Sequence, residues 1–400
     1  MKNWVKSFFS KKAPQILKNK SFKELGDVRI ICYEDTHAWI LGKFALRMQE
    51  SMVKMGIRSD IEKFGDANKL IGHHIIYYDA VKKWSPIETF MITHLDADWK
   101  YEKVRELLDL YDMGICMSEE LCNKLRKMGM PASKLCYINP AQDGLIKPRP
   151  KVIGISTKVH IDGRKKENEI VAVFKSLPVG AYSLKILGSG WDNQVEELRK
   201  KGHLVEYIDH FDYEIYVNEF MASLDYFVYW THDEGTMTFL DAIAADVKTI
   251  VTPQGYHLDI EKGIDFPISN AADLANILNR LHTERIDRIS RVQDLTWDEY
   301  TWRHVVIWDY LRISASHSLD DEMAGIDIQI TDHIKGILDE KRTIPSEEDL
   351  RLASAIAEKH HLNVVGEQLV RKMLIFYPKS SYARAKLREI YSFEFGKEEQ

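Results

Sequence analysis

The chain has 400 residues, of which 45% are hydrophobic and 29% are charged. This composition is typical of a globular protein that is long enough for two or more domains. The formal net charge of -6 gives no reason to expect nucleic-acid binding, and no apolar run reaches the length of a transmembrane helix.

Residues 1–27 form a basic segment in which seven lysines outnumber Glu24 and Asp27. Aromatic side chains among the lysines leave two interpretations, a helix on an anionic membrane surface or an ordinary packed N-terminal helix. The segment lacks the apolar core and cleavage site of a signal peptide. Four scattered cysteines form neither a disulfide framework nor a Cys-x-x-Cys unit: Cys32, Cys116, Cys122 and Cys136. We therefore expect a cytoplasmic protein, either free or peripheral on the inner face of the membrane.

Apolar runs alternate with helical patterns from residue 28 onward. The expected strands are "VRIICY", "HHIIYY", "TFMIT" and "MGICM", and helical stretches such as "AWILGKFALRMQESMVKMG" and "YEKVRELLDLY" lie between them. Continuous apolar strands that alternate with helices indicate a parallel sheet covered on both faces. Residues 131–151 contain four prolines and break this rhythm, so we expect a linker there.

The alternation starts again after the linker, with "KVIGI", "SLKILG", "LVEYI", "DYFVYW" and "KTIV" as expected strands. The predicted fold class is therefore α/β, with two Rossmann-like doubly wound domains. We expect an N-terminal domain over 28–146, completed by a helix around 296–312, and a C-terminal domain over 147–295. Residues 316–400 lack strand patterns and predict a helical tail, faintly like one tetratricopeptide unit.

Ligands of open α/β sheets collect at the carboxyl ends of the strands, which draws attention to three turns of the second domain. In "GRKKEN", Gly163, Arg164 and Lys165 precede a helix, where amides and cations together suit a diphosphate. The alternative is an exposed basic helix start. In "LGSG", Gly188 and Gly190 allow either a tight turn or close approach of a ligand.

The third turn, "DEGTMTFLD", carries Asp233, Glu234 and Asp241. Asp233 and Glu234 suit the first turn of a helix, where acids complement the helix dipole. Asp241 falls one turn into an apolar helix beside alanines. A carboxylate in that place can accept two hydrogen bonds from a vicinal diol, such as the ribose of a nucleotide.

These three turns, in this order, resemble the donor domain of a GT-B glycosyltransferase, most closely the retaining glycosyltransferase family 4. The spacing of Asp233 and Asp241 matches the family's acid pair, although both acids are usually Glu there. The resemblance covers roughly residues 28–312 and implies two domains that face a cleft. It implies that the first acid, Asp233 or Glu234, lies by the donor sugar and that Asp241 binds the ribose.

The resemblance also implies a role for His94, in "MITHLDADW", opposite the reacting sugar, whereas a lone histidine is more often structural. The family's N-terminal glycine loop is reduced to Gly42, which with Trp39 is expected on the acceptor side. Asp96 and Asp98 form a DxD, the metal motif of the GT-A architecture. Two repeated domains favour GT-B, so we expect no metal and no other cofactor.

The expected function is retaining transfer of a sugar from a nucleoside diphosphate sugar to an acceptor hydroxyl. A glycan or lipid-linked acceptor in bacterial surface polysaccharide assembly follows by analogy with the family. Two alternatives stay open: a GT-B enzyme of the epimerase type, or an inactive scaffold whose tail binds partner proteins or a second copy. The sequence leaves undetermined the donor base and sugar, the acceptor, the choice between Asp233 and Glu234, and the oligomeric state.

Overall fold

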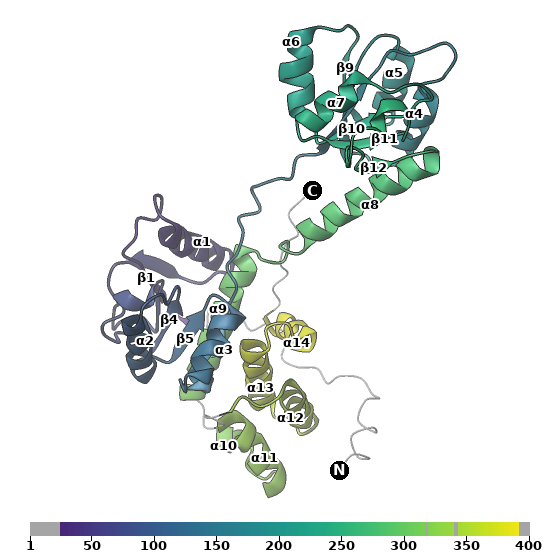
Figure 1. Ribbon diagram of the computed structural model, residues 1–400. Coiled ribbons are helices and arrows are strands. Elements are labelled where there is room, and N and C mark those ends of the chain that lie inside the picture. The colour runs from purple at the N-terminus through teal and green to yellow at the C-terminus, as the bar shows by residue number, and fades with distance from the viewer. Residues whose placement is uncertain (1–24, 317–318, 340–342, 392–400) are drawn as a thin grey trace. The chain divides into compact units, whose positions relative to one another are not determined.

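The computed structural model describes residues 25–316, 319–339 and 343–391 (Figure 1). The chain divides into two compact units. The first contains the described residues up to Asp143 and from Asp294 onward, and the second is Gly144–Gln293. The basic segment predicted over 1–27 lies almost entirely outside the described residues. None of the described helices combines the length and the apolarity needed to cross a bilayer.

The first unit contains a parallel sheet with the strand order β2-β1-β3-β4-β5-β6. Its strands are β1 (Val28–Ile31), β2 (Ser59–Glu62), β3 (Ile71–His74), β4 (Ile87–Ile92), β5 (Met113–Cys116) and β6 (Leu135–Tyr137). The connecting helices are α1 (Ile40–Lys54), α2 (Asp98–Leu110) and α3 (Glu119–Lys127). β3, β4 and β5 are buried along their whole length, which explains the mostly apolar sequences of β4 and β5. In β3 the buried residues include His73 and His74.

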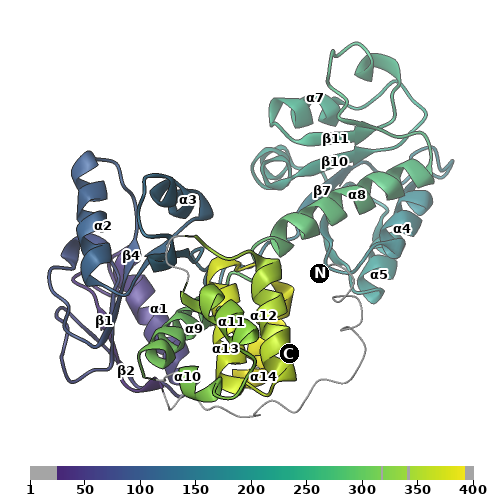
Figure 2. The same ribbon diagram turned by 90° about the horizontal axis from the view of Figure 1, so that it is seen from below.

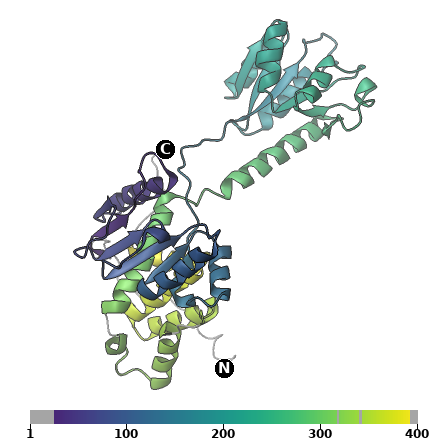
Figure 3. The ribbon, with the colours of Figure 1, turned by 60° about the vertical axis from the view of Figure 1, so that its left-hand side comes forward.

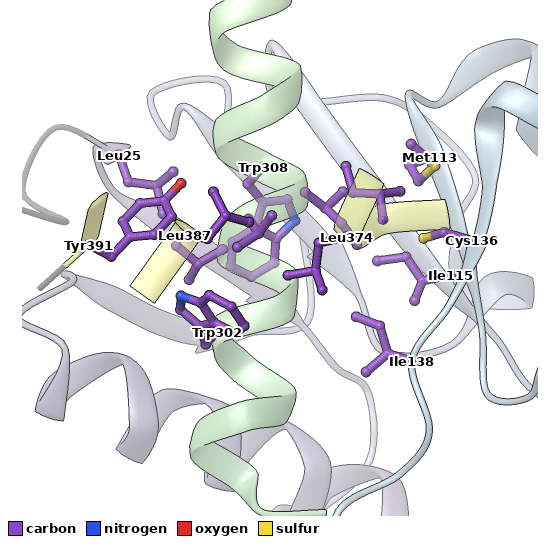
Figure 4. Close-up of a cluster of buried hydrophobic side chains, with 14 of the residues drawn as sticks. Leu25, Met113, Ile115, Cys136, Ile138, Trp302, Trp308, Leu374, Leu387 and Tyr391 are labelled. Atoms are coloured by element: carbon purple, nitrogen blue, oxygen red, sulfur yellow. The ribbon is translucent and has the colours of Figure 1, made fainter. Parts of the chain in front are cut away.

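Helix α9 (Trp297–Ser316) packs against the first sheet, although it follows the second unit in the chain. The indole Nε1 of Trp308 donates to Thr89 Oγ1 of β4 at 2.9 Å. Trp302 and Trp308 of this helix are fully buried in the core that α9 shares with the sheet and the tail (Figure 4). The second unit is therefore an insertion between the first sheet and the helix that completes its core.

The helical tail belongs to the first unit and covers α9 (Figure 2). Its helices are α10 (Leu319–Glu322), α11 (Ile328–Asp339), α12 (Glu347–Lys359), α13 (Asn363–Phe376) and α14 (Ser381–Tyr391). Helix α13 contacts α9 and β6, and α12 and α14 pack against α13. The yellow-green helices of the tail lie against the first sheet in Figure 3. Leu374 and Leu387 of the tail share one hydrophobic cluster with Met113 and Ile115 of the sheet (Figure 4).

A buried polar network joins the tail to α9. The Arg371 guanidinium lies 3.1 Å from Asp309 Oδ2 of α9 and 3.1 Å from Glu367 Oε2. The Tyr391 hydroxyl accepts from Arg371 Nε at 2.9 Å and donates to Asp309 Oδ2 at 2.8 Å. All four side chains are buried. Because each charge in this network has a partner, the tail is held to the first unit by polar as well as apolar contacts.

The second unit contains a parallel sheet with the strand order β12-β11-β10-β7-β8-β9. Its strands are β7 (Lys151–Ser156), β8 (Tyr182–Leu187), β9 (Leu204–Ile208), β10 (Tyr226–Tyr229), β11 (Lys248–Val251) and β12 (Phe266–Pro267). The main helices are α4 (Glu167–Ser176), α5 (Asp192–Lys200), α7 (Met237–Ala244) and α8 (Ala271–Ser290). A short α6 (Tyr213–Ile215) continues into a π-helical turn, Tyr216–Phe220, and a 3₁₀ turn, Met221–Ser223.

The strand order of the second sheet places β7 next to β10, so the chain leaves β7 toward β8 on one side and returns to β10 on the other. This reversal is the topological switch point of a Rossmann fold, and ligands of such sheets bind in the crevice that it opens at the carboxyl ends of the strands.

The two predicted Rossmann-like domains and the helical C-terminal region are confirmed. The predicted linker is wrong in part, because Leu135–Tyr137 within it form the buried edge strand β6. The prolines of this segment indicated a linker, and a strand of only three residues is too short to give a clear apolar pattern. Strand β2, with the sequence "SDIE", was also missed, because an edge strand that is only half-buried does not need the apolar pattern of a central one.

Candidate functional site

The carboxyl end of the second sheet brings Lys165 and Asp233 together. Lys165 ends the loop after β7, and Asp233 lies in the turn after β10. Lys165 is only 8% exposed, and its ammonium forms an ion pair with Asp233 Oδ2. Because β7 and β10 flank the switch point, the pair lies where the topology opens a ligand crevice.

Tyr229, the last residue of β10, connects the two charges. Its hydroxyl accepts a hydrogen bond from Lys165 Nζ and lies 3.0 Å from Asp233 Oδ2, to which it donates. Partial burial raises the pKa of the Asp233 carboxyl, but hydrogen bonds from Lys165 and from the Gly235 amide outweigh burial, so this pKa lies below its usual value. Asp233 is therefore a carboxylate at neutral pH, held in one place by four donors, on Lys165, Tyr229, Gly235 and Gln254.

His257 holds the turn that carries Asp233. Its ring is fully buried, its Nε2 accepts from the Thr236 amide at 3.1 Å, and its Nδ1 lies 3.2 Å from the carbonyl oxygen of Thr252. An amide can only donate and a carbonyl can only accept, so these two contacts require the neutral ring with its proton on Nδ1. Burial lowers the pKa of His257, which favours the same form.

The glycines of the "LGSG" turn bring two loops into contact. Gly188 has φ +128°, and a Cβ there would lie 2.4 Å from the carbonyl oxygen of Thr157. The Val159 amide donates to the Ser189 carbonyl at 2.9 Å. The loop after β7, which also carries Lys165, and the loop after β8 are therefore tied together. Gly190 also has a positive φ of +91°.

The remaining residues of "GRKKEN" do not join the ion pair. Arg164 is exposed, and its Nη2 lies 3.1 Å from His160 Nδ1. Gly163 has φ +64° with open space where a side chain would lie, so it is needed for its conformation alone. The buried Glu167, in the first turn of α4, accepts from the His160 amide at 2.9 Å. The Glu167 carboxylate therefore lies at the start of α4, where the sequence predicted a diphosphate.

Asp241 lies on α7 and is exposed. The hydroxyl of Tyr216, which is itself buried, donates a hydrogen bond to Asp241 Oδ2. Among the described residues, no cation forms an ion pair with this carboxylate. Asp241 therefore keeps acceptor capacity for a diol, at the same sheet edge as Asp233. Glu234 is exposed next to Asp233, and its carbonyl accepts from the Tyr256 amide at 3.3 Å.

In the first unit, the predicted acceptor-side residues lie at the carboxyl edge of the first sheet. His94 is exposed shortly after β4, and its carbonyl accepts from the Tyr77 hydroxyl at 3.3 Å. Trp39 precedes α1 and is 66% exposed. Gly42 is buried. A Cβ at this position would lie 2.0 Å from the carbonyl oxygen of Asp35, so a side chain does not fit there.

The two acids of the predicted DxD, Asp96 and Asp98, are not part of a group of described side chains that could hold a metal ion. Asp96 forms an i,i+4 ion pair with Lys100, and Asp98 begins α2. Within the described part of the chain, no group of three or more His, Cys, Asp or Glu side chains could hold a metal ion. Whether the protein needs a metal stays a prediction.

No protein-family model and no curated protein sequence matches the chain. Solved structures that resemble it include HepE from Anabaena in complex with UDP-glucose, at 11% identity and a TM-score of 0.28 over 73% of this chain and 99% of that one. Sucrose-phosphate synthase from Thermosynechococcus elongatus matches at 13% identity and 0.29, over 72% and 99%. WaaG, a glycosyltransferase involved in lipopolysaccharide biosynthesis, matches at 14% and 0.29, over 73% and 100%. These values are too low to support a conclusion about function, which is argued from the site alone.

The arrangement can bind an anion and a polyol side by side. A lysine ammonium has three N–H donors, and among the described residues Lys165 uses two of them, on Asp233 and Tyr229. The third donor is available to a phosphate oxygen, as is the exposed guanidinium of Arg164. Asp233 and Asp241 supply acceptors for hydroxyl groups.

The sequence analysis missed three residues of this site, Tyr229, Tyr216 and His257. Tyr229 ends an apolar strand and looked like core. Tyr216 lies in "FDYEIYV", where three aromatic residues in a short stretch were the available signal. His257 gave no signal, because its role depends on a turn that is distant in sequence.

Proposed function

We propose that this protein transfers a sugar from a nucleoside diphosphate sugar to an acceptor hydroxyl. The observation that carries this proposal is the ion pair of Lys165 with Asp233 at the switch point between β7 and β10. A diphosphate needs cationic donors, and a sugar needs hydroxyl acceptors. The site offers both, because the Lys165 ammonium and the Asp233 carboxylate are in direct contact.

Each part of the donor has a counterpart in the site. The diphosphate binds Lys165 and Arg164 and approaches the backbone at Gly188 and Gly190. The ribose diol binds Asp241, and the transferred sugar lies by Asp233 or Glu234. The support for this order is the hydrogen bond of Tyr216 to Asp241, which brings the segment after β9 to α7, together with the ion pair of Lys165 with Asp233 at the switch point.

Transfer breaks the bond between the sugar C1 and the diphosphate oxygen and forms one between C1 and the acceptor oxygen. Negative charge grows on the leaving diphosphate, so Lys165 and Arg164 stabilise the transition state more than the ground state. We propose retention of the anomeric configuration, in which the departing phosphate takes the acceptor's proton. This route needs no protein nucleophile. It also needs no metal if the two cations neutralise the diphosphate.

The acceptor is proposed to bind the carboxyl edge of the first sheet, where Trp39 and His94 are exposed. A flat exposed indole suits the apolar face of a sugar ring. A glycan or lipid-linked acceptor, a role in bacterial surface polysaccharide assembly and a peripheral position on the cytoplasmic face of the membrane extend this proposal by family resemblance.

The test is a panel of nucleotide sugars, assayed for release of nucleoside diphosphate with and without lipid extract and with and without EDTA. Transfer predicts acceptor-dependent release that EDTA leaves unchanged. Release of an altered sugar without an acceptor would favour the epimerase-type alternative instead. Asp233→Ala and Glu234→Ala show which acid serves the sugar, and His94→Ala tests the acceptor side. Full activity in all three variants would contradict the assigned catalytic residues.

A further inference from the structure

The helical tail contains a cavity of about 120 Å³ between α12, α13 and α14 (Figure 1). One buried water needs only roughly 15 Å³, whereas pockets for drug-sized ligands start at roughly 300 Å³. The cavity therefore suits one small, ring-sized molecule. We call it the tail cavity. The tail lies outside the residues that resemble the GT-B family, so that resemblance assigns no role to it.

Gly366 lines the tail cavity although the helix would favour a side chain at this position. It is the fourth residue of α13 (Asn363–Phe376), and glycine inside a helix is less stable than alanine. A Cβ at Gly366 would have only Ala357 Cβ nearby, at 3.7 Å, which is an ordinary contact. Packing therefore does not require a glycine here. Its effect is to keep the wall of the cavity open.

His361 also lines the tail cavity, at a position where the turn would favour glycine. The Leu362 amide donates to the Ala357 carbonyl at 2.9 Å, and the His361 amide donates to the Glu358 carbonyl at 3.2 Å. These two bonds form a Schellman motif, in which the position of His361 is usually a glycine. His361 has φ +56°, which is strained for a residue with a side chain. Costs of this kind gather at functional sites.

The polar lining of the cavity places a donor beside an acceptor. Lys386 Nζ lies 3.2 Å from Glu358 Oε1, and the two side chains are 18% and 22% exposed. An ammonium has three donors and a carboxylate about four acceptor sites, so the pair keeps hydrogen-bonding capacity. A hydroxyl group both donates and accepts, so it can bind the two groups without breaking their ion pair. Ser354 and Tyr382 add hydroxyl groups to the lining.

The rest of the lining favours a neutral ligand with an apolar face. The buried side chains of Leu362, Val370 and Ile390 contribute apolar surface. An anion is not expected at the start of α13, because the first free amides there are already used. The Val364 and Val365 amides donate to the Glu322 carboxylate at 2.9 and 2.8 Å. A charged ligand would also have to compete with the ion pair of Glu358 and Lys386.

We propose that the tail cavity binds one neutral sugar ring. Its hydroxyl groups bond to Glu358 and Lys386, and its C–H face lies against Val370 and Ile390. A sugar ring combines the two properties that the lining requires, adjacent hydroxyl groups and an apolar face. The site lies in the first unit, so it goes beyond the nucleotide site proposed in the second unit and does not depend on it.

The test is saturation-transfer NMR on the full chain with glucose, galactose, mannose and N-acetylglucosamine, and with L-valine as a zwitterion. At least one sugar should receive saturation, and L-valine should not. Lys386→Met removes the donor but keeps an unbranched side chain, so it should weaken the binding of that sugar by about 5-fold or more. Absence of transfer to every sugar, or transfer to L-valine, would overturn the proposal.

Gly366→Ala separates binding from folding. It should raise the midpoint of thermal unfolding, because alanine favours the helix, and weaken sugar binding by about 5-fold or more, because the methyl group enters the cavity. His361→Gly should change both quantities in the same directions. Gly336→Ala is the matched control, since Gly336 is an exposed residue of α11 with open space around the added Cβ. It should raise the midpoint and leave sugar binding unchanged.

Unchanged sugar binding in Gly366→Ala and Lys386→Met would show that the sugar binds elsewhere and overturn the proposal. A lower unfolding midpoint in Gly366→Ala would also overturn it, because the fold itself would then require the glycine. Nucleotide binding should be the same in all of these variants and in the wild type. Failure of the sugar site therefore leaves the proposed function standing, and a chain that binds no nucleotide can still bind the sugar.

Discussion

Lys165 and Asp233 form an ion pair although 68 positions separate them in the sequence. The contact exists because the sheet order places β7 beside β10, so that the loops after these two strands meet. Ligands of open α/β sheets bind at such a switch point, between the loops at the carboxyl ends of the strands. The pair is thus a direct product of the fold, and it gives the crevice both a cation and a carboxylate.

Replacing Lys165 tests its part in diphosphate binding. Lys165→Ala should weaken nucleoside diphosphate binding at least about 10-fold, because a charge-assisted donor is lost and Asp233 is left as an unbalanced negative charge. Lys175→Ala is the matched control, since Lys175 lies at the far end of α4 in an exposed pair with Glu197. Calorimetric titration of both variants is the measurement, and an equal affinity for the two would remove Lys165 from the site.

Gly188→Ala tests the close contact between the loops after β7 and β8. Any L-residue at its φ of +128° is strained, and its Cβ would meet the Thr157 carbonyl oxygen at 2.4 Å. Gly180→Ala is the control, because Gly180 has φ +81° with open space around the added Cβ. We expect Gly180→Ala to lower the free energy of unfolding by about 1–2 kcal/mol. Gly188→Ala should lower the free energy of unfolding by more than Gly180→Ala does, and it should also weaken nucleotide binding. Equal costs in urea unfolding would show that the loop contact is unimportant.

The tautomer of His257 predicts a pH dependence. Burial lowers its pKa in the folded protein. The neutral ring is therefore favoured on folding, and its contribution to stability is complete above the unfolded value of about 6.5. This contribution falls as the pH drops from that value toward the lower folded pKa, because protonated Nε2 can no longer accept from Thr236.

Nucleotide affinity should fall over the same range, because the turn that carries Asp233 loses its support. His257→Gln provides an acceptor that does not titrate, so its affinity should depend less on pH between about 7 and 5. Parallel pH profiles of the wild type and the variant would contradict this role for His257.

The buried network of the tail predicts a large stability effect far from the site. Arg371→Ala removes the buried guanidinium that pairs with both Asp309 and Glu367. Asp309 then keeps only Arg312 as a cationic partner among the described residues, so the free energy of unfolding should fall by about 3–5 kcal/mol. Arg105→Ala, whose side chain is 48% exposed and pairs with Glu102 at 3.7 Å, should change it by less than about 0.5 kcal/mol. Urea unfolding measures both, and equal small effects would show that the tail is only loosely attached.

Much of the fold could be predicted from the sequence, because central parallel strands need uninterrupted apolar runs. The apolar runs "TFMIT" and "DYFVYW" predicted β4 and β10 in this way. The edge strands β2 and β6 could not be predicted, since one is half polar and the other is three residues long. The attachment of the tail to α9 also escaped prediction, because Arg371 looks like any surface arginine until its partners are known.

The sequence drew attention to Asp233 and Asp241 because they are close in sequence, and their roles stay a prediction. Residues that act across loops could not be predicted, because Tyr229 and His257 gain their roles only from contacts made by folding. A sequence motif also does not show where each of its side chains points. Arg164 belongs to the basic motif, but its guanidinium contacts His160 and not the ion pair.

Binding of UDP, GDP and ADP to the full chain and to Asp241→Asn tests the central claim most directly. This substitution keeps the shape of the side chain and removes its charge and one acceptor oxygen. We predict that at least one of the three nucleotides binds the wild-type chain and that Asp241→Asn weakens it about 10-fold or more. Absence of binding by all three nucleotides, or an unchanged affinity in Asp241→Asn, would contradict a nucleotide site at this sheet edge.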